Sequence, residues 1–256
     1  MIHPSAIIDP SARVDESCSI GAYAIVGADV VIGSGTRIGP HVVINGPTVI
    51  GKDNHIFQFA SIGEDPQDLK FDGHDSRLQI GDNNRIREFV TINRGTSGGG
   101  GLTSIGNDNL LMAYVHIAHD CEVGDNTVFA NSASLAGHVQ VGDYAILGGF
   151  SLVHQFSRVG AHSFSGMGSV INKDVPPYLL VSGHYAEAKG VNKQGLRRRG
   201  FDDKEIAALQ KTFVKIVRRR GVKDDDSNKE VEELAHEFPH VNELLQFMRA
   251  EGRGTV

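Results

Sequence analysis

The sequence predicts an all-β solenoid followed by a small α-helical domain, and two observations lead to this prediction. From Ile2 onward an apolar residue recurs at every sixth position, and glycine often follows it. A six-residue period fits neither the turn of an α-helix nor the alternation of a long strand, but it is typical of a β-helix built from short strands and tight turns. The repeated positions are Ile2, Ile8, Val14, Ile20, Val26, Ile32, Ile38, Ile44, Ile50, Ile56, Ile62, Ile80, Ile86 and Ile92, and, after a one-residue slip, Ile105, Leu111, Ile117, Val123, Phe129, Leu135, Val141, Leu147, Val153, Val159 and Ile171.

The period also predicts where each side chain points. The apolar residue of each hexad should fill the interior, together with a small residue two positions before it, such as Ala24, Thr36 or Ala133. Every other position should face outward or lie in a turn. A histidine at one of those other positions is therefore not explained as a core residue.

The repeat is interrupted twice and then ends. Residues 64–79 are polar, and residues 93–104 contain four consecutive glycines, so both stretches should be loops extruded from the stack. Long loops on a rigid scaffold are frequently functional. The repeat should end at Pro176 and Pro177. We expect a β-helix over residues 1–188 and a helical domain over residues 189–256.

Helical spacing appears in the last quarter of the chain. Asp202 or Asp203 should cap a helix that ends near Gly221, where Arg218, Arg219 and Arg220 would favour the helix dipole. Its apolar positions are Ile206, Leu209, Phe213, Ile216 and Val217. Two shorter helices should follow, one around residues 231–237 and one after Pro239 with Leu244, Leu245 and Met248 on its apolar face.

Composition limits the function classes. Only two cysteines are present, far apart at positions 18 and 121, so no disulfide framework is expected, and the N-terminus enters the repeat without an apolar segment. These features predict a cytoplasmic protein without stable membrane insertion. The net charge is −6, but residues 189–220 hold 11 basic and 3 acidic groups. A local basic patch disfavours nucleic-acid binding and favours a phosphate or an acidic partner.

Four histidines stand at outward positions of three neighbouring coils. They are His116, His119, His138 and His154. If three hexads form one coil, residues 18 apart stack about 4.8 Å from each other, and His119 lies directly below Gly137. A neutral imidazole can act as a general base, an adjacent Asp120 can fix its tautomer, and the Gly137 N–H can hold an oxyanion.

Two other interpretations of these histidines remain open. Each could be a solvated turn residue, although the convergence of four favours a site. They could also bind zinc, but the H-x4-H spacing of hexapeptide-repeat carbonic anhydrases is absent. Cys121 stands five residues after His116 at a small inward position, where a core role is expected. We therefore predict no metal and no cofactor.

The chain resembles the UDP-N-acetylglucosamine O-acyltransferases of lipid A biosynthesis, within the hexapeptide-repeat acyltransferases, over essentially its whole length. The similarity rests on QFASIGEDPQDLKF (58–71), TINRGT (91–96), NLLMAYVHIAHDC (109–121), LAGHV (135–139), VHQF (153–156), GAHSFSGMGS (160–169), DVPPY (174–178) and GLRRRGF (195–201). The resemblance implies a left-handed parallel β-helix and a homotrimer with active sites between subunits. It also implies transfer of an (R)-3-hydroxyacyl group from acyl carrier protein to the 3-hydroxyl of UDP-N-acetylglucosamine.

The resemblance also implies residue roles. His119 is similar to the general base, Asp120 to its orienting partner and Gly137 to the oxyanion donor. The residues similar to substrate contacts are Gln67, Asp68, Lys70, His116, His138, His154 and Gln155, and those similar to nucleotide and phosphate contacts are Asn192, Gln194, Arg198 and Arg199. The basic residues of 189–220 would also suit the acidic carrier protein.

Three positions bear on specificity. Asn93 stands where the family usually has histidine, and Gln194 stands where glutamate is common. Met167 occupies a position similar to the ruler for acyl length, where glycine admits longer chains. Met167 therefore predicts a shorter donor of the 3-hydroxydecanoyl type.

Two alternative functions are considered. A related N-acyltransferase would use similar chemistry on a UDP-amino sugar. A purely structural β-helix would have no need of an outward histidine cluster, two polar loops and a basic junction.

Overall fold

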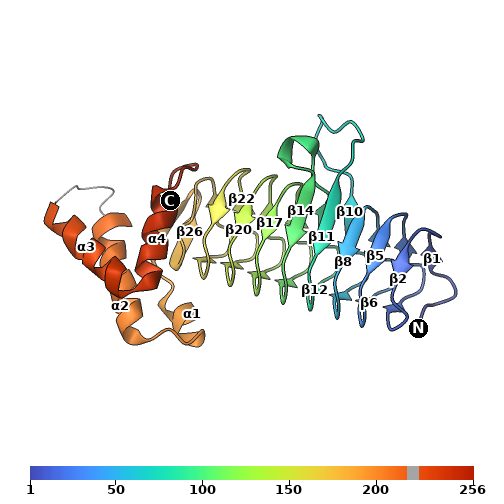
Figure 1. The fold of residues 1–256 in the computed structure, drawn as a ribbon, viewed down its shortest axis with the longest axis horizontal. Helices are drawn as coiled ribbons and strands as arrows, with labels where there is room; N and C mark the ends of the chain where they lie inside the picture. The colour runs from blue at the N-terminus through green and yellow to red at the C-terminus, as the bar shows by residue number, and fades with distance from the viewer. Residues whose placement is uncertain (218–224) are drawn as a thin grey trace.

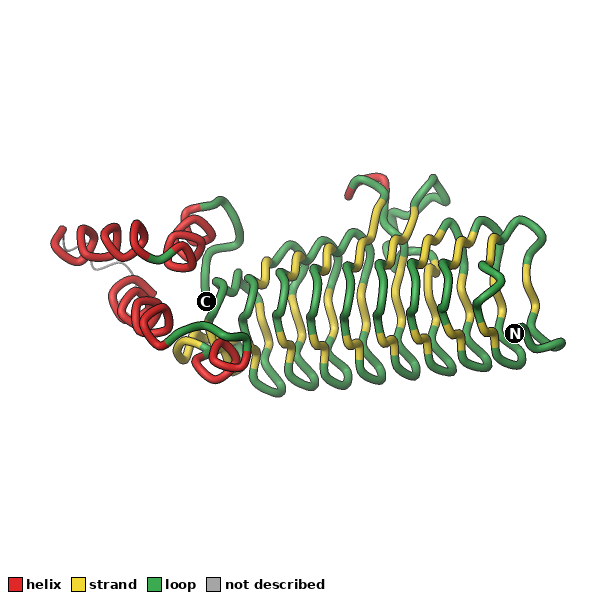
Figure 2. Tube along the Cα trace, turned by 60° about the horizontal axis from the view of Figure 1, so that its bottom comes forward, coloured by secondary structure: helices red, strands yellow, loops and turns green. Residues whose placement is uncertain are grey.

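The computed structural model describes residues 1–217 and 225–256 and shows a long three-sided prism with helices at its C-terminal end (Figure 1). Three sheets of parallel strands form the sides, and successive coils stack along the prism (Figure 2). Sheet 1 contains β1 (Ile7–Ile8), β4 (Ile25–Val26), β7 (Val43–Ile44), β10 (Ser61–Glu64), β13 (Thr91–Asn93), β16 (His116–Ile117), β19 (Ser134–Leu135), β22 (Leu152–Val153) and β25 (Val170–Ile171).

The other two sheets complete each coil. Sheet 2 contains β2 (Arg13–Val14), β5 (Val30–Ile32), β8 (Thr48–Ile50), β11 (Arg77–Ile80), β14 (Leu102–Ile105), β17 (Glu122–Val123), β20 (Gln140–Val141) and β23 (Arg158–Val159). Sheet 3 contains β3 (Ser19–Ile20), β6 (Arg37–Ile38), β9 (His55–Ile56), β12 (Arg85–Ile86), β15 (Leu110–Leu111), β18 (Val128–Phe129), β21 (Ile146–Leu147), β24 (Phe164–Ser165), β26 (Leu179–Gly183) and β27 (Ala186–Val191).

The predicted coil length is confirmed by the strand register. Ile117 pairs with Leu135, and Leu135 pairs with Val153, so residues 18 apart stack where no loop intervenes. The repeated apolar residues from Ile20 to Ile171 form one continuous buried core, and Ala24, Thr36 and Ala133 are fully buried beside them. Stacking of parallel strands satisfies their backbone hydrogen bonds, while the interior packs one aliphatic layer per coil.

The corners of the prism share one backbone conformation. Many turns place a non-glycine residue at positive φ, including Asp120 at 58° and His138 at 61°. In these tight turns the side chain of the left-handed residue projects outward from the corner. Side chains on successive coils therefore form columns, such as the stacked rings of Tyr23, His41 and Phe59 between sheets 3 and 1.

Two loops leave the stack side by side, as predicted (Figure 1). The first joins β10 to β11 and the second joins β13 to β14, with the short helix η1 (Ser97–Gly99) at its tip. Arg94 fixes the base of both loops. Its guanidinium donates 2.6 Å to the Gly63 carbonyl and pairs with the Asp65 carboxylate.

The C-terminal end differs from the prediction in one respect. The stack does not end at Pro176 and Pro177, because β26 still pairs in parallel with β24 and then turns back into β27. The predicted domain boundary, between residues 188 and 189, falls inside β27. This hairpin contributes to two cores, since Val181 and Ala186 pack in the coil interior while Leu179 and Val191 pack against the helices.

The helices follow the hairpin. They are α1 (Lys193–Arg198), α2 (Asp203–Thr212), the π-helical turn η2 (Phe213–Val217), α3 (Asp225–Glu237) and α4 (Pro239–Arg249). Asp202 caps α2 as one member of a capping box with Glu205, which confirms one of the two predicted caps. α1 was not predicted. The expected helix end near Gly221 and the arginines at 218–220 lie outside the described residues.

Candidate active site

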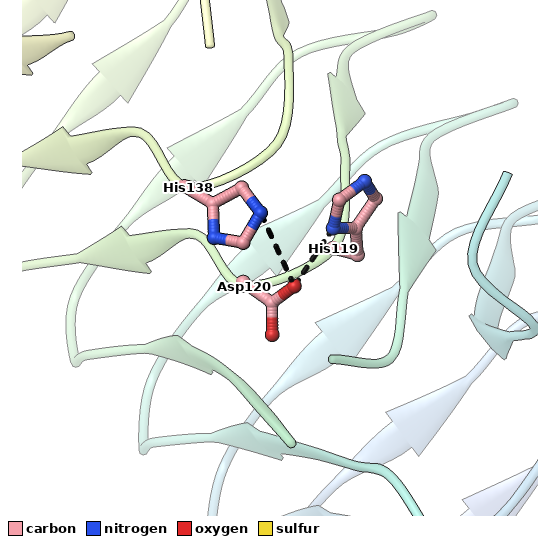
Figure 3. Close-up of side chains that lie close together, drawn as sticks. All are labelled: His119, Asp120 and His138. Atoms are coloured by element: carbon pink, nitrogen blue, oxygen red, sulfur yellow. Dashed lines mark hydrogen bonds and ion pairs between the residues drawn. The ribbon is translucent and has the colours of Figure 1, made fainter. Parts of the chain in front are cut away.

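Three of the predicted residues meet at the corner between sheets 1 and 2. His119 and Asp120 follow β16, and His138 occupies the same corner one coil further on (Figure 3). His119 Nδ1 lies 2.8 Å from Asp120 Oδ2, and His138 Nε2 lies 3.8 Å from the same oxygen. Both rings therefore converge on a single carboxylate. We call His119, Asp120 and His138 together the site corner.

The Asp120 carboxylate is held by the second extruded loop. The Thr96 backbone N–H donates to Oδ1 at 2.8 Å, and the Thr96 hydroxyl donates to Oδ2 at 2.6 Å. The Asp120 N–H in turn donates 2.8 Å to Thr103 Oγ1. The Asp120 side chain is 1% exposed. A buried carboxylate with this many donors is fixed in orientation and can hold its histidine partner in one position.

Gly137 lies directly against the His119 ring. A Cβ added at Gly137 would stand 2.5 Å from His119 Cε1 and 2.8 Å from Nε2. This contact confirms that the two residues stack on neighbouring coils. Because the Asp120 carboxylate accepts the hydrogen bond of His119 Nδ1, the other ring nitrogen, Nε2, lies toward Gly137 and is available to take a proton. Within residues 1–217 and 225–256, the Gly137 N–H takes no hydrogen-bond acceptor.

His138 and His116 flank the base in different ways. Burial lowers the pKa of His138, partly offset by the Asp120 charge, and its ring stacks on Phe156 with centroids 4.4 Å apart. Burial also lowers the pKa of His116, with a further contribution from His119. His116 Nδ1 lies 2.8 Å from the Thr91 hydroxyl. Lowered pKa values keep both imidazoles neutral near pH 7.

A hollow of about 400 Å³ opens on this face of sheet 1. His116, His119 and Gly137 line it, together with Gln67 from the first extruded loop. Asp68 follows Gln67, and its charge reaches His138. Asp68 also accepts a hydrogen bond from the Lys70 N–H at 3.0 Å. Gln67 of the loop and the residues of the corner therefore line one hollow.

Other predicted residues lie apart from the base. His154 and Gln155 are exposed at the next turn of the same corner, where His154 Nδ1 lies 3.0 Å from the Gln155 carbonyl. Met167 is 82% exposed in the turn between β24 and β25, outside the hollow that contains His119. Asn93 is buried and donates 2.7 Å to the Asp65 carbonyl, so it anchors the first loop.

The predicted nucleotide contacts gather on sheet 3, and not beside His119. Asn192, Gln194 and Arg198 line a second hollow of about 310 Å³ against Ile146, Phe164 and Leu180. Asn192 caps α1 by accepting from the Gly195 N–H at 3.2 Å. Arg199 points elsewhere, with its guanidinium 4.5 Å from the Tyr144 ring centre. The two groups of predicted contact residues thus line two separate hollows, on two different sides of one chain.

The donor set of the site corner favours proton transfer over metal binding. Ligand atoms of His119, Asp120 and His138 all lie within 4.8 Å of one another. However, both Asp120 oxygens already accept hydrogen bonds from Thr96 or His119. Cys121 is fully buried, and burial raises the pKa of its thiol to about 12, so it is a core residue as predicted.

Several functional residues were missed from the sequence. Thr96 and Thr103 hold Asp120, Thr91 contacts His116, and Phe156 supports His138. Phe156 lies 18 residues after His138, and Thr91 pairs with His116 on the next coil. The coil register could therefore have suggested both contacts. Thr96 could not have been found this way, because it reaches Asp120 from an extruded loop.

Comparison with known proteins adds an independent line of evidence. A family described as "Udp N-acetylglucosamine O-acyltransferase; Domain 2" matches residues 174–256, and one described as "Bacterial transferase hexapeptide (six repeats)" matches residues 11–46 and 102–137. The UDP-N-acetylglucosamine O-acyltransferase LpxA of Moraxella catarrhalis is 47% identical, covering 100% of this chain and 99% of its own, with a TM-score of 0.95.

Two further structures agree. LpxA of Acinetobacter baumannii is 44% identical over 100% of this chain and 99% of its own, with a TM-score of 0.93. The UDP-N-acetylglucosamine acyltransferase of Francisella novicida is 41% identical over 100% of this chain and 94% of its own, with a TM-score of 0.95. These likenesses confirm the predicted fold, with its left-handed winding, and the predicted enzyme class, an acyltransferase. The chain belongs to the LpxA family of UDP-N-acetylglucosamine O-acyltransferases.

Proposed function

We propose that this protein transfers an (R)-3-hydroxyacyl group from acyl carrier protein to the 3-hydroxyl of UDP-N-acetylglucosamine, with His119 as general base. One observation supports the mechanism. The Asp120 carboxylate accepts a hydrogen bond from His119 Nδ1 at 2.8 Å, while Nε2 lies toward Gly137 at the hollow. The donor and acceptor are those of the family that the sequence resembles. The relatives named above support UDP-N-acetylglucosamine as the sugar substrate.

The proposed steps use groups at the site corner. His119 Nε2 takes the proton of the sugar hydroxyl as its oxygen attacks the thioester carbonyl carbon. The negative charge that develops on the carbonyl oxygen is accepted by the Gly137 N–H. Collapse of the intermediate breaks the carbon–sulfur bond, and the imidazolium returns its proton to the thiolate that leaves. Asp120 stabilises the imidazolium throughout, because its carboxylate is buried and held by Thr96.

We further propose a homotrimer with active sites between subunits. The hollow beside His119 lies on sheet 1, whereas Asn192, Gln194 and Arg198 lie at α1 beside sheet 3, so this side of a second copy can complete the site. Exposed apolar side chains support this contact, with Ile7 and Ile25 on sheet 1. The exposed rings of Tyr23, Phe59, Phe89 and Tyr114 continue along the corner shared by sheets 1 and 3. Exposed apolar columns of this kind are typical of an interface.

The acyl length and the cellular setting are proposed as well. Met167 supports a donor of the 3-hydroxydecanoyl type, since its exposed side chain can narrow a groove completed by a neighbouring subunit. Among the described residues, no helix has the length and apolar character needed to cross a bilayer. We propose a cytoplasmic enzyme on the basis of its carrier-protein donor.

The deciding experiment compares wild type with His119→Ala, using 3-hydroxydecanoyl and 3-hydroxymyristoyl carrier protein as donors and UDP-N-acetylglucosamine as acceptor. We expect transfer by wild type, preference for the shorter donor, and a loss of about 10²–10⁴-fold in the variant. Full activity in His119→Ala would show that another residue acts as the base. Transfer only to a 3-amino analogue of the sugar would indicate an N-acyltransferase instead.

The position of the site between subunits has its own test. His119→Ala and Arg198→Ala inactivate opposite halves of the proposed site. Mixed trimers refolded from both variants should regain part of the wild-type rate, because some interfaces then combine two intact halves. If the mixed trimers recover no transfer activity, all residues of the site must come from one chain.

A further inference from the structure

The tips of the two extruded loops are joined by one side chain. His74, in the first loop, accepts a hydrogen bond at Nε2 from the Ser97 backbone N–H in the second loop. Its Nδ1 atom contacts the Asp72 carboxylate. Because a backbone N–H can only donate, Nε2 must be unprotonated, and Nδ1 carries the hydrogen that Asp72 accepts. The His74 ring also contacts Phe71, with centroids 5.2 Å apart.

The same loop tip holds the catalytic carboxylate. Ser97 is bonded directly to Thr96, whose N–H and hydroxyl both donate to Asp120. Gly99 packs so closely against the Asp120 carboxyl group that a Cβ there would collide with it. A continuous series of contacts therefore runs from His74 through Ser97 and Thr96 to Asp120, and from Asp120 to His119.

The loop tip is held by short backbone hydrogen bonds of its own, from the Gly99 and Gly101 N–H groups to the Thr96 carbonyl at 3.0 and 2.7 Å. Its base is tied by backbone hydrogen bonds, from Arg77 N–H to the Gly101 carbonyl at 2.8 Å and from Gly95 N–H to the Arg77 carbonyl at 3.3 Å. Beyond that base the tip contains four consecutive glycines, which leave the backbone with high conformational entropy. A side chain from outside the tip is an effective way to select one conformation.

We propose that His74 is a positioning residue for the acyl transfer: by fixing Ser97 it holds Thr96 on Asp120 and thereby keeps Asp120 oriented toward His119. The proposal rests on the proposed function of His119. His74 itself does not line the hollow that contains His119, and so it acts only through the loop.

The consequence concerns the basicity of His119. Two Thr96 donors spread the negative charge of Asp120. If the loop tip loosens, the carboxylate loses these donors, and its electrostatic attraction for the protonated His119 ring becomes stronger. The titratable groups that face His119 are Asp120, His116 and His138. The acid limb of the rate profile should therefore move to higher pH when the tip is released.

The test compares His74→Phe, which keeps a ring but no acceptor, with His74→Gln, which keeps an acceptor. We expect His74→Phe to lower kcat about 10-fold, the value of roughly one hydrogen bond to a charged network, with KM for UDP-N-acetylglucosamine nearly unchanged. The acid limb of kcat/KM should move to higher pH, and His74→Gln should restore both. His3→Phe, at an exposed histidine near the N-terminus, is the control.

Coupling to Thr96 provides a second measure. If His74 acts through Thr96, the double variant His74→Phe/Thr96→Val should lose less activity than the two single losses combined, because Thr96→Val removes only one of the two Thr96 donors to Asp120. Additive losses, or wild-type kcat and pH profile in His74→Phe, would overturn the proposal.

Amide hydrogen exchange separates this proposal from the proposed function. The Thr96 and Ser97 amides should exchange faster in His74→Phe than in wild type and in His74→Gln. Unchanged exchange at both amides would refute the role of His74, whatever the activity. If wild type transfers no acyl group while exchange changes as expected, the loop contact stands and the assignment of His119 to this reaction fails.

Discussion

Two clusters that combine histidine and carboxylate side chains lie along the same β-helix, and they differ in what packs against them. In the site corner, His119 and Asp120 border a hollow of about 400 Å³. In the other cluster, the Tyr178 hydroxyl donates to Glu243 and lies 3.1 Å from His240 Nδ1. We call this second set, together with His162, the junction cluster.

The two clusters share their backbone origin. Asp120 and Tyr178 both occupy left-handed turn positions, with φ of 58° and 68°. The difference lies in what packs outside the corner. A residue of an extruded loop, Thr96, holds the Asp120 carboxylate, whereas α4 brings His240 and Glu243 directly onto Tyr178. The same residue types therefore border a hollow at one corner and join the β-helix to the C-terminal helices at the other.

The largest effect is expected at the site corner. Asp120→Asn should lower kcat by about 10²–10⁴-fold, because the amide cannot stabilise the imidazolium of His119 and can fix the wrong tautomer. Steady-state transfer assays measure this. The matched control is Asp29→Asn, at an exposed residue with the same left-handed turn conformation, φ of 56°. An Asp120→Asn enzyme within threefold of wild type would remove the assigned role of the carboxylate.

The next effect concerns space at the site corner. Gly137→Ala places a methyl group 2.5 Å from the present position of His119 Cε1, so the ring must shift. We expect kcat to fall about 10- to 100-fold with little change in melting temperature. Gly190→Ala is the control, since a Cβ there meets no atom within 4 Å. Equal activity of the two alanine variants would show that the His119 position is not critical.

A smaller effect is expected at the junction cluster, on stability alone. Tyr178→Phe keeps the buried ring but removes the hydroxyl that bonds Glu243 and His240. The free energy of unfolding should decrease by about 1 kcal/mol, measured by denaturant titration, and kcat should stay unchanged. Tyr185→Phe, at an exposed tyrosine, is the control. A loss of activity without a loss of stability in Tyr178→Phe would mean that the two clusters are coupled.

The smallest effect is a change in pH dependence. Burial, with a contribution from Arg199, lowers the pKa of His162 from 6.5 to about 4. Between these values the unfolded chain binds more protons than the folded one, so His162 makes stability fall as the pH drops from about 6.5 toward 4. His162→Phe keeps the stacking between Tyr144 and Tyr178 and should flatten that decline. An unchanged slope in urea titrations over this range would contradict the lowered pKa.

The sequence was most informative where the fold repeats. The six-residue period identified the inward side chains, and three hexads per coil predicted that His119 lies beneath Gly137, which the structure confirms. It could not show that Asn192 and Arg198 lie on a different sheet from His119. That arrangement depends on which side of the prism the last hairpin and α1 leave the stack.

By itself, then, the sequence determined the coil and the meeting of His119 with Gly137, because a strict repeat converts position in the chain directly into position in space, while its resemblance to a known family indicated the enzyme class. Only the tertiary structure decided which groups surround that corner. Thr96 on Asp120 and His74 on Ser97 come from loops outside the repeat, and the hairpin that continues past Pro177 closes the stack against the helices. Contacts of that kind arise from side-chain packing between distant segments, and no local period records them.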